Sequence, residues 1–117
     1  MAQTLINING DVRDAASLTV PNDRTFRGAW QFNGNVVEVD MVAARDIHRD
    51  NLRAERAPRL QALDVDYMKA LEDGDTPAQQ AIVGVKQALR DVTADPRIEA
   101  AATPDELTAL TLDALLA

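Results

Sequence analysis

The sequence predicts an α+β fold, in which an N-terminal β-hairpin module precedes an antiparallel helical hairpin and a short C-terminal helix. Two observations support this prediction. Asn33-Gly34 stands between two short runs of alternating apolar residues, which is the strongest short-range signal for a β-hairpin. From Asp40 onward, apolar residues recur at three- and four-residue spacing, which indicates helices. We therefore expect a β-rich module over residues 1–39 and a helical region over 40–117.

The predicted hairpin is apolar on one face. If Asn33-Gly34 forms a type I′ turn, Trp30 faces Val37 across the ribbon. One face then carries the large apolar side chains: Trp30, Phe32, Val37 and Val39. An isolated two-stranded ribbon is marginal in water, so it must pack against something. The alternating run over residues 4–8, followed by an Asn-Gly turn, offers a partner.

Start and stop signals divide the helical region. Asp40 is expected to cap the first helix, and Pro58 to kink or break it near Ala57. An acidic turn containing Gly74 then precedes Thr76-Pro77, a typical helix start. The boundaries predict helices at about 40–57, 59–73 and 76–93 and a short helix at about 104–116. The short connection between 59–73 and 76–93 favours an antiparallel pair.

Composition excludes several function classes. The chain has 117 residues, a net charge of −7 and no cysteine, so it forms no disulfide and no thiolate metal site. The negative charge argues against free nucleic acid as a partner. The N-terminal residues lack a basic segment followed by an apolar run, so we expect no signal peptide. No apolar run approaches the roughly 18–20 residues of a membrane span.

Catalytic and metal-binding patterns are also missing from the sequence. His48 is the only histidine, and the sequence contains no Gly-x-Ser-x-Gly elbow. Zinc normally requires at least three protein ligands. The two acidic loop segments, residues 11–14 and 73–75, lack the spacing of acidic residues that an EF-hand needs. We therefore expect no enzymatic activity, no metal and no cofactor, with His48 an exposed or interfacial helix residue.

Four arginines form the first candidate surface. They recur at spacings of four, four and three residues and line one helix face: Arg45, Arg49, Arg53 and Arg56. One interpretation is a docking stripe for an acidic protein surface, because arginine pairs carboxylates with two parallel hydrogen bonds. The alternative is a solvated face held by local ion pairs. The spacing allows the pairs Asp46–Arg49, Asp50–Arg53 and Glu55–Arg59.

The aromatic residues of the hairpin form the second candidate surface. Phe26, Trp30 and Phe32 lie together with Val37 and Val39 in the predicted β-module. Exposed aromatic side chains often anchor protein interfaces. Since so small a sheet has few other residues to fill its interior, the same cluster could instead be the local core.

The combination of segments resembles a known group of proteins. PNDRTFRGAWQFNGNVVEVDMVAARDIHRDNLRAER, LDVDYMKALEDGD, KQALRDVTADP and TPDEL together resemble small proteins encoded among the tail-fibre and tail-assembly genes of tailed bacteriophages. The resemblance covers about residues 20–112. The second half is similar to the C-terminal helical region of tail fibre assembly proteins. It departs from them in the second helix, where Val85-Lys86-Gln87 stands in place of the usual Trp or Tyr.

This resemblance implies a non-enzymatic virion structural protein, a tail-fibre or baseplate-region component that docks to neighbouring virion subunits. One alternative is a tail fibre assembly chaperone that is absent from the mature particle. Another is a capsid decoration, or cement, protein. The implied partners are other phage structural proteins, in a homo-oligomer or multi-copy assembly, without nucleic acid or membrane. The implied location is the tail region of the virion, and the host cytoplasm during assembly.

Overall fold

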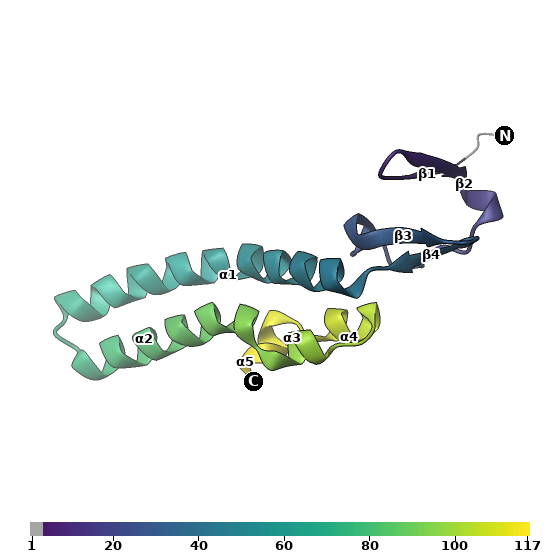
Figure 1. Cartoon of the computed structure of the whole chain (residues 1–117). Helices are drawn as coiled ribbons and strands as arrows, with labels where there is room; N and C mark the ends of the chain where they lie inside the picture. The colour runs from purple at the N-terminus through teal and green to yellow at the C-terminus, as the bar shows by residue number, and fades with distance from the viewer. Residues whose placement is uncertain (1–3) are drawn as a thin grey trace. The chain divides into compact units, whose positions relative to one another are not determined.

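The structure, a computed structural model, describes residues 4–117 and confirms the α+β fold. Two small antiparallel hairpins come first, followed by a long helix, a second helix and short C-terminal helices (Figure 1). Residues 1–3, where the predicted β-module begins, lie outside the described residues. The chain divides into two compact units, 1–47 and 48–117, so the boundary falls inside the long helix.

The first hairpin consists of β1 (Leu5–Ile8) and β2 (Asp11–Asp14). Asn9 and Gly10 join the strands with φ values of 53° and 90°, as a type I′ turn requires. The alternating run over residues 4–8 was expected to support the Trp30 hairpin. It contacts β3 and forms its hydrogen-bonded pair with β2, whose mainly polar sequence gives no strand signal.

The second hairpin consists of β3 (Trp30–Asn33) and β4 (Val36–Val39). Trp30 pairs with Val39 rather than with Val37, so the predicted register is wrong by two residues. The turn is at Gly34-Asn35, where Gly34 supplies a positive φ of 60° at the first central position, while Asn33 continues the strand. Because side chains alternate with a period of two, a two-residue shift leaves the same side chains on the same face.

Within the N-terminal unit, Arg13 joins the two hairpins, and Thr19 attaches the segment between them to the second hairpin. The Arg13 guanidinium lies 4.0 Å from the centroid of the Phe32 ring and donates to the Gly34 carbonyl at 2.9 Å. Thr19 forms a parallel bridge to Val36 on β4. The buried apolar residues of this unit are Phe26, Ala29, Trp30, Val37 and Ala44.

Helix α1 (Met41–Glu72) contains Pro58 without ending there. Asp40 caps it as predicted, since its carboxylate accepts the Val42 N–H at 3.1 Å. The predicted division into helices 40–57 and 59–73 is wrong. Pro58 removes only one donor, and the carbonyl that loses its partner belongs to the exposed Ala54, where water can replace it.

Gly74 reverses the chain between α1 and α2 (Thr76–Asp91). Its N–H bonds to the Leu71 carbonyl and the Asp75 N–H to the Ala70 carbonyl, with Gly74 at a φ of 66°. These two bonds form a Schellman motif, which satisfies the carbonyls left open at the helix end. Asp75, rather than the predicted Thr76, caps α2 by accepting from the Ala78 N–H at 3.1 Å.

The C-terminal region is more broken than predicted. A 3₁₀ turn (Val92–Ala94) follows α2, and then α3 (Pro96–Ala100), which the sequence did not predict. The predicted helix 104–116 is two helices, α4 (Pro104–Ala109) and α5 (Leu112–Leu116). The hydroxyl of Thr103 caps α4 and the hydroxyl of Thr111 caps α5. The predicted helix 104–116 is therefore interrupted where Thr111 begins a new helix.

Burial in the helical unit is concentrated at one end of the helical hairpin. There the paired helices meet the short C-terminal helices around Leu52, Leu89, Val92, Ile98, Leu107, Leu112 and Leu115. We call this the near end. Between residues 58 and 88, on both sides of the Gly74 turn, Ala70 is the one buried residue. We call this stretch the far end.

Candidate binding surfaces

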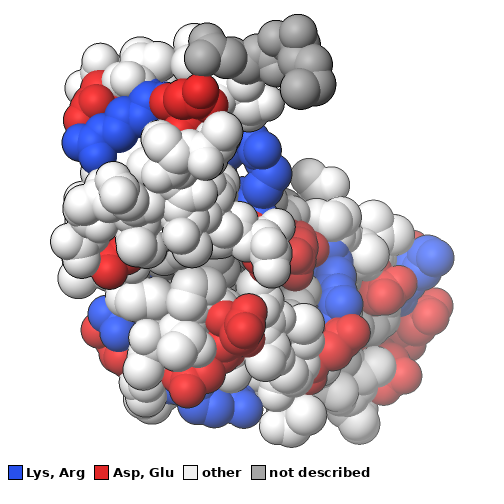
Figure 2. Space-filling model, turned by 90° about the vertical axis from the view of Figure 1, so that its right-hand side faces the viewer, with Lys and Arg blue, Asp and Glu red and all other residues white. Residues whose placement is uncertain are grey.

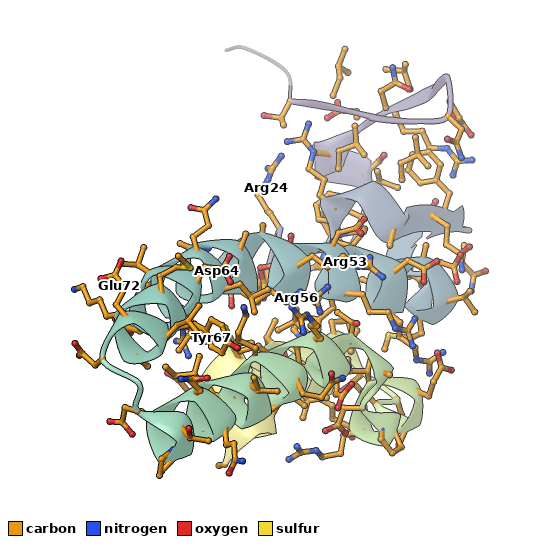
Figure 3. All side chains as sticks on the ribbon, turned by 90° about the vertical axis from the view of Figure 1, so that its left-hand side faces the viewer. Arg24, Arg53, Arg56, Asp64, Tyr67 and Glu72 are labelled. Atoms are coloured by element: carbon orange, nitrogen blue, oxygen red, sulfur yellow. The ribbon has the colours of Figure 1, made fainter. Side chains whose placement is uncertain are left out.

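Two members of the arginine stripe serve the helical unit itself. Arg56 donates to the carbonyls of Leu89 and Arg90 at 3.3 and 2.9 Å, and Figure 3 shows its side chain between α1 and α2. Arg49 donates to the Thr93 carbonyl at 3.3 Å. These carbonyls belong to the C-terminal end of α2 and its 3₁₀ extension, where the helix dipole favours a cation. Arg49 and Arg56 therefore stabilise the end of α2.

The ion pairs of the stripe are only partly local. Arg53 pairs with Asp50 at 2.6 Å, as predicted, and about half of its side chain is exposed. Arg49 also reaches Glu99, fifty residues further along the chain. The predicted pair Glu55–Arg59 is wrong, because Arg59 pairs with Asp113 at 2.9 Å. The fourth member of the stripe, Arg45, belongs to the N-terminal unit and is half-buried.

The aromatic cluster lies mostly in the interior of the N-terminal unit. Phe26 and Val37 are 1% and 3% exposed, and Trp30 is 7% exposed, whereas Phe32 and Val39 are half-buried. This burial favours the local-core interpretation. The indole Nε1 of Trp30 is also buried and has no hydrogen-bond acceptor among the described residues. An unsatisfied buried donor costs about 1–3 kcal/mol.

His48 is buried, so the expectation of an exposed or interfacial side chain is wrong. Its Nε2 lies 2.8 Å from the Leu110 carbonyl oxygen, which only accepts, so this nitrogen carries the proton. Position 48 lies one helical turn from Ala44 and from Leu52, both fully buried. That spacing is the sequence signal that could have predicted the burial of His48.

A groove of about 640 Å³ lies in the N-terminal unit, and sequence analysis did not predict it. Every residue from Thr4 to Asn9 lines it. Because side chains alternate across a strand, one face would contribute only every second residue, so the groove follows the edge of β1. Its opposite wall includes Val20, Arg24, Arg27, Gly28 and Trp30.

The cations of the groove are Arg24 and Arg27. The Arg24 guanidinium lies 5.8 Å from the centroid of the Trp30 ring. Neither arginine has an ion-pair partner within residues 4–117. Figure 2 shows basic and acidic side chains interspersed on the face that it draws. Arg24 and Arg27 are the charged residues among those that line the groove, so attraction of an anion to the groove rests on these two side chains.

The far end of the helical hairpin exposes large apolar side chains. Five of them are between 47% and 55% exposed: Val65, Met68, Leu71, Val83 and Val85. Across the pair of helices, Asp64 forms an ion pair with Lys86, whose Nζ also lies 5.8 Å from the Tyr67 ring centroid (Figure 3). Val65, Met68 and Leu71 recur at three-residue spacing and so are neighbours on the surface of α1. Neighbouring exposed apolar side chains of this size typically mark protein interaction sites.

Within residues 4–117, no group of three or more His, Asp and Glu side chains is placed to hold a metal ion. None of the helices in this part of the chain is long and apolar enough to cross a membrane. No known protein family matches the sequence, and neither the curated proteins nor the solved structures include a significant match.

Proposed function

We propose that this chain is a non-enzymatic virion structural protein of a tailed bacteriophage, a tail-fibre or baseplate-region component that docks to neighbouring subunits. The proposal rests on the sequence resemblance over about residues 20–112. One structural observation supports a docking role: the half-exposed apolar side chains at the far end of the helical hairpin. The partners would be other virion proteins or further copies of the chain.

The far end is suited to docking because its helices are already formed. α1 and α2 are continuous on both sides of the Gly74 turn, and that turn is held by its own hydrogen bonds. A partner that covers Val65, Met68 and Leu71 would bury apolar surface without having to order the backbone first. Each buried Å² of such surface contributes roughly 25 cal/mol, and preorganisation lowers the entropic cost of association.

Quantitative mass spectrometry of purified particles from the encoding phage or prophage tests the proposed location. Stoichiometric presence at a low copy number is expected for a tail or baseplate component. A much higher copy number would instead favour capsid decoration. Abundance in infected-cell lysate combined with absence from the particles would overturn the structural role in favour of an assembly chaperone.

The double variant Met68→Ser/Leu71→Ser tests the docking surface. It removes apolar area from half-exposed positions, so the helical content of the purified chain should be retained while incorporation into particles falls. Val42→Ser is the matched control, because Val42 is 68% exposed and lies outside the far end. Normal incorporation of the double variant would exclude this surface from docking.

A further inference from the structure

The open edge of β1 has a defined set of free backbone groups. The Ala15 N–H donates to the Thr4 carbonyl at 2.8 Å, and the register pairs Ile6 with Arg13. Backbone bonds alternate along an antiparallel strand, so Thr4, Ile6 and Ile8 direct theirs toward β2. The N–H and C=O groups of Leu5 and Asn7 consequently face the opposite edge, which borders the groove.

An extended chain placed along this edge would complete those backbone bonds. Strand addition to an exposed sheet edge is a common mode of peptide recognition, with affinity from the main chain and specificity from side-chain pockets. Among residues 4–117 the first sheet has two strands, so β1 has one side occupied by β2 and the other open to a third strand.

The opposite wall determines which side chains such a strand would carry. Arg24 and Arg27 offer guanidinium groups without an ion-pair partner within the described residues, and a guanidinium pairs best with a carboxylate. Trp30 lines the same wall, and the Arg24 guanidinium lies 5.8 Å from the centroid of its ring. The wall therefore suits a strand that carries both carboxylates and apolar side chains.

We propose that the groove between β1 and the Arg24–Trp30 segment binds an extended acidic segment of a partner protein, which adds to β1 as a third strand. Its backbone pairs with Leu5 and Asn7, and its carboxylates pair with Arg24 and Arg27. This groove belongs to the N-terminal unit and is a different surface from the far end of the helical hairpin.

Binding of short labelled peptides to the full chain, measured by fluorescence anisotropy, tests the proposal. The probe is a peptide in which Glu alternates with Val, and a Lys-for-Glu peptide is the charge control. The acidic peptide should bind saturably and the basic one should not. Arg24→Gln/Arg27→Gln should weaken binding by about tenfold or more, whereas Arg53→Gln, at an exposed arginine of the helical unit, should leave it unchanged.

The same peptide with N-methylated alternate residues separates strand addition from simple charge attraction. Methylation removes backbone donors and should abolish binding, while amide exchange at Leu5 and Asn7 should slow in the complex with the unmodified peptide.

Several results would overturn the proposal. One is equal binding of the acidic and basic peptides, and another is unchanged binding by Arg24→Gln/Arg27→Gln. Undiminished binding of the N-methylated peptide would exclude strand addition. Tighter binding of a short single-stranded oligonucleotide than of the acidic peptide, or no saturable binding of the peptide up to about 1 mM, would exclude an acidic protein segment as the ligand.

Discussion

The two ends of the helical hairpin use similar sequence patterns but bury very different amounts of side chain. At the near end, Leu52 and Leu89 are each 1% exposed. At the far end, Leu63 and Ile82 on the same two helices are only half-buried, and Leu71 and Val85 are 50% and 47% exposed. The difference is a third layer: α3, α4 and α5 contribute Ile98, Leu107, Leu112 and Leu115 to the near end.

This comparison shows that amphipathic periodicity fixes which residues are able to be buried, but not whether they are. Two paired helices leave part of each apolar stripe open to solvent, and a covering element must complete the core. In the near end the chain supplies that element itself. In the far end no described part of the chain does so, which is the basis of the proposed docking surface.

The largest expected difference between the ends is the loss of stability when a leucine is replaced by alanine. Leu89→Ala should lower the free energy of unfolding by about 2–5 kcal/mol, because it leaves a cavity in a packed core. Leu71→Ala removes the same atoms from a half-exposed position and should cost less than about 1 kcal/mol. Urea unfolding followed by circular dichroism measures both. Equal losses would show that the far end is packed as tightly as the near end.

The next largest effect concerns the arginine that caps α2. Arg56→Met should lower the free energy of unfolding by about 1–3 kcal/mol, because the carbonyls of Leu89 and Arg90 lose a charged donor. Arg53→Met is the matched control on the same helix, with an exposed local ion pair worth about 0.2–1 kcal/mol. If the two variants were equally stable, Arg56 would have no special role in the near end.

Pro58 lies at the border between the two ends and offers a gain in stability. Pro58→Ala should raise the free energy of unfolding by about 1–2 kcal/mol, because it restores a helical N–H inside α1. Pro77→Ala is the control, since Pro77 lies in the first turn of α2, where proline is well tolerated. Thermal unfolding of both variants provides the measurement, and a lower Tm for Pro58→Ala would contradict this expectation.

The smallest expected effect is a pH dependence at the near end. The hydrogen bonds from the Arg97 side chain, and then from its backbone N–H, hold the pKa of Asp95 below its ordinary value. A carboxyl whose pKa is lower in the folded state stabilises the fold above its unfolded pKa, near 3.9, and this contribution is lost as the pH falls through the folded value. The wild type should therefore have a higher Tm than Asp95→Asn at about pH 7, and the gap should narrow toward about pH 2.5.

A gap in Tm that stays constant between those two pH values would show that the ionised carboxylate of Asp95 is not the stabilising species. Asparagine is the suitable replacement because it is also a good helix N-cap. Asp95→Asn therefore keeps the capping geometry at the start of α3 and removes the charge.

Local signals in the sequence predicted the parts of the fold that depend on local physics. Asp40 as a cap, the Gly74 turn and the apolar face of the second hairpin were all predicted correctly. The continuity of α1 through Pro58 was not predicted, because propensity counts the lost hydrogen bond but not the support from the long helical segments 41–57 and 59–72 on either side. β2 was missed because its sequence is mainly polar and it forms through pairing with β1.

The candidate binding surfaces depend on tertiary structure and were harder to predict. Spacing placed Arg49 and Arg56 on one helix face, but their acceptors lie more than thirty residues away in sequence. Arg24 and Arg27 belong to no recognisable sequence motif. They become candidate ligand-binding residues only because the fold places them in the lining of the groove beside β1. No pattern along the chain brings those segments together, so only the folded unit shows the groove.

The boundary between the two compact units has a practical consequence for dissecting this protein. It falls between Ile47 and His48, inside α1, and not in a connecting loop. A protease needs an extended backbone of several residues, so cleavage there requires local unfolding of the helix. Limited digestion should cut first at exposed turns such as Gly34-Asn35 or Asp73-Gly74. The two units will therefore not be released as intact fragments, and genetic truncation at residue 47 would divide a helix that both units share.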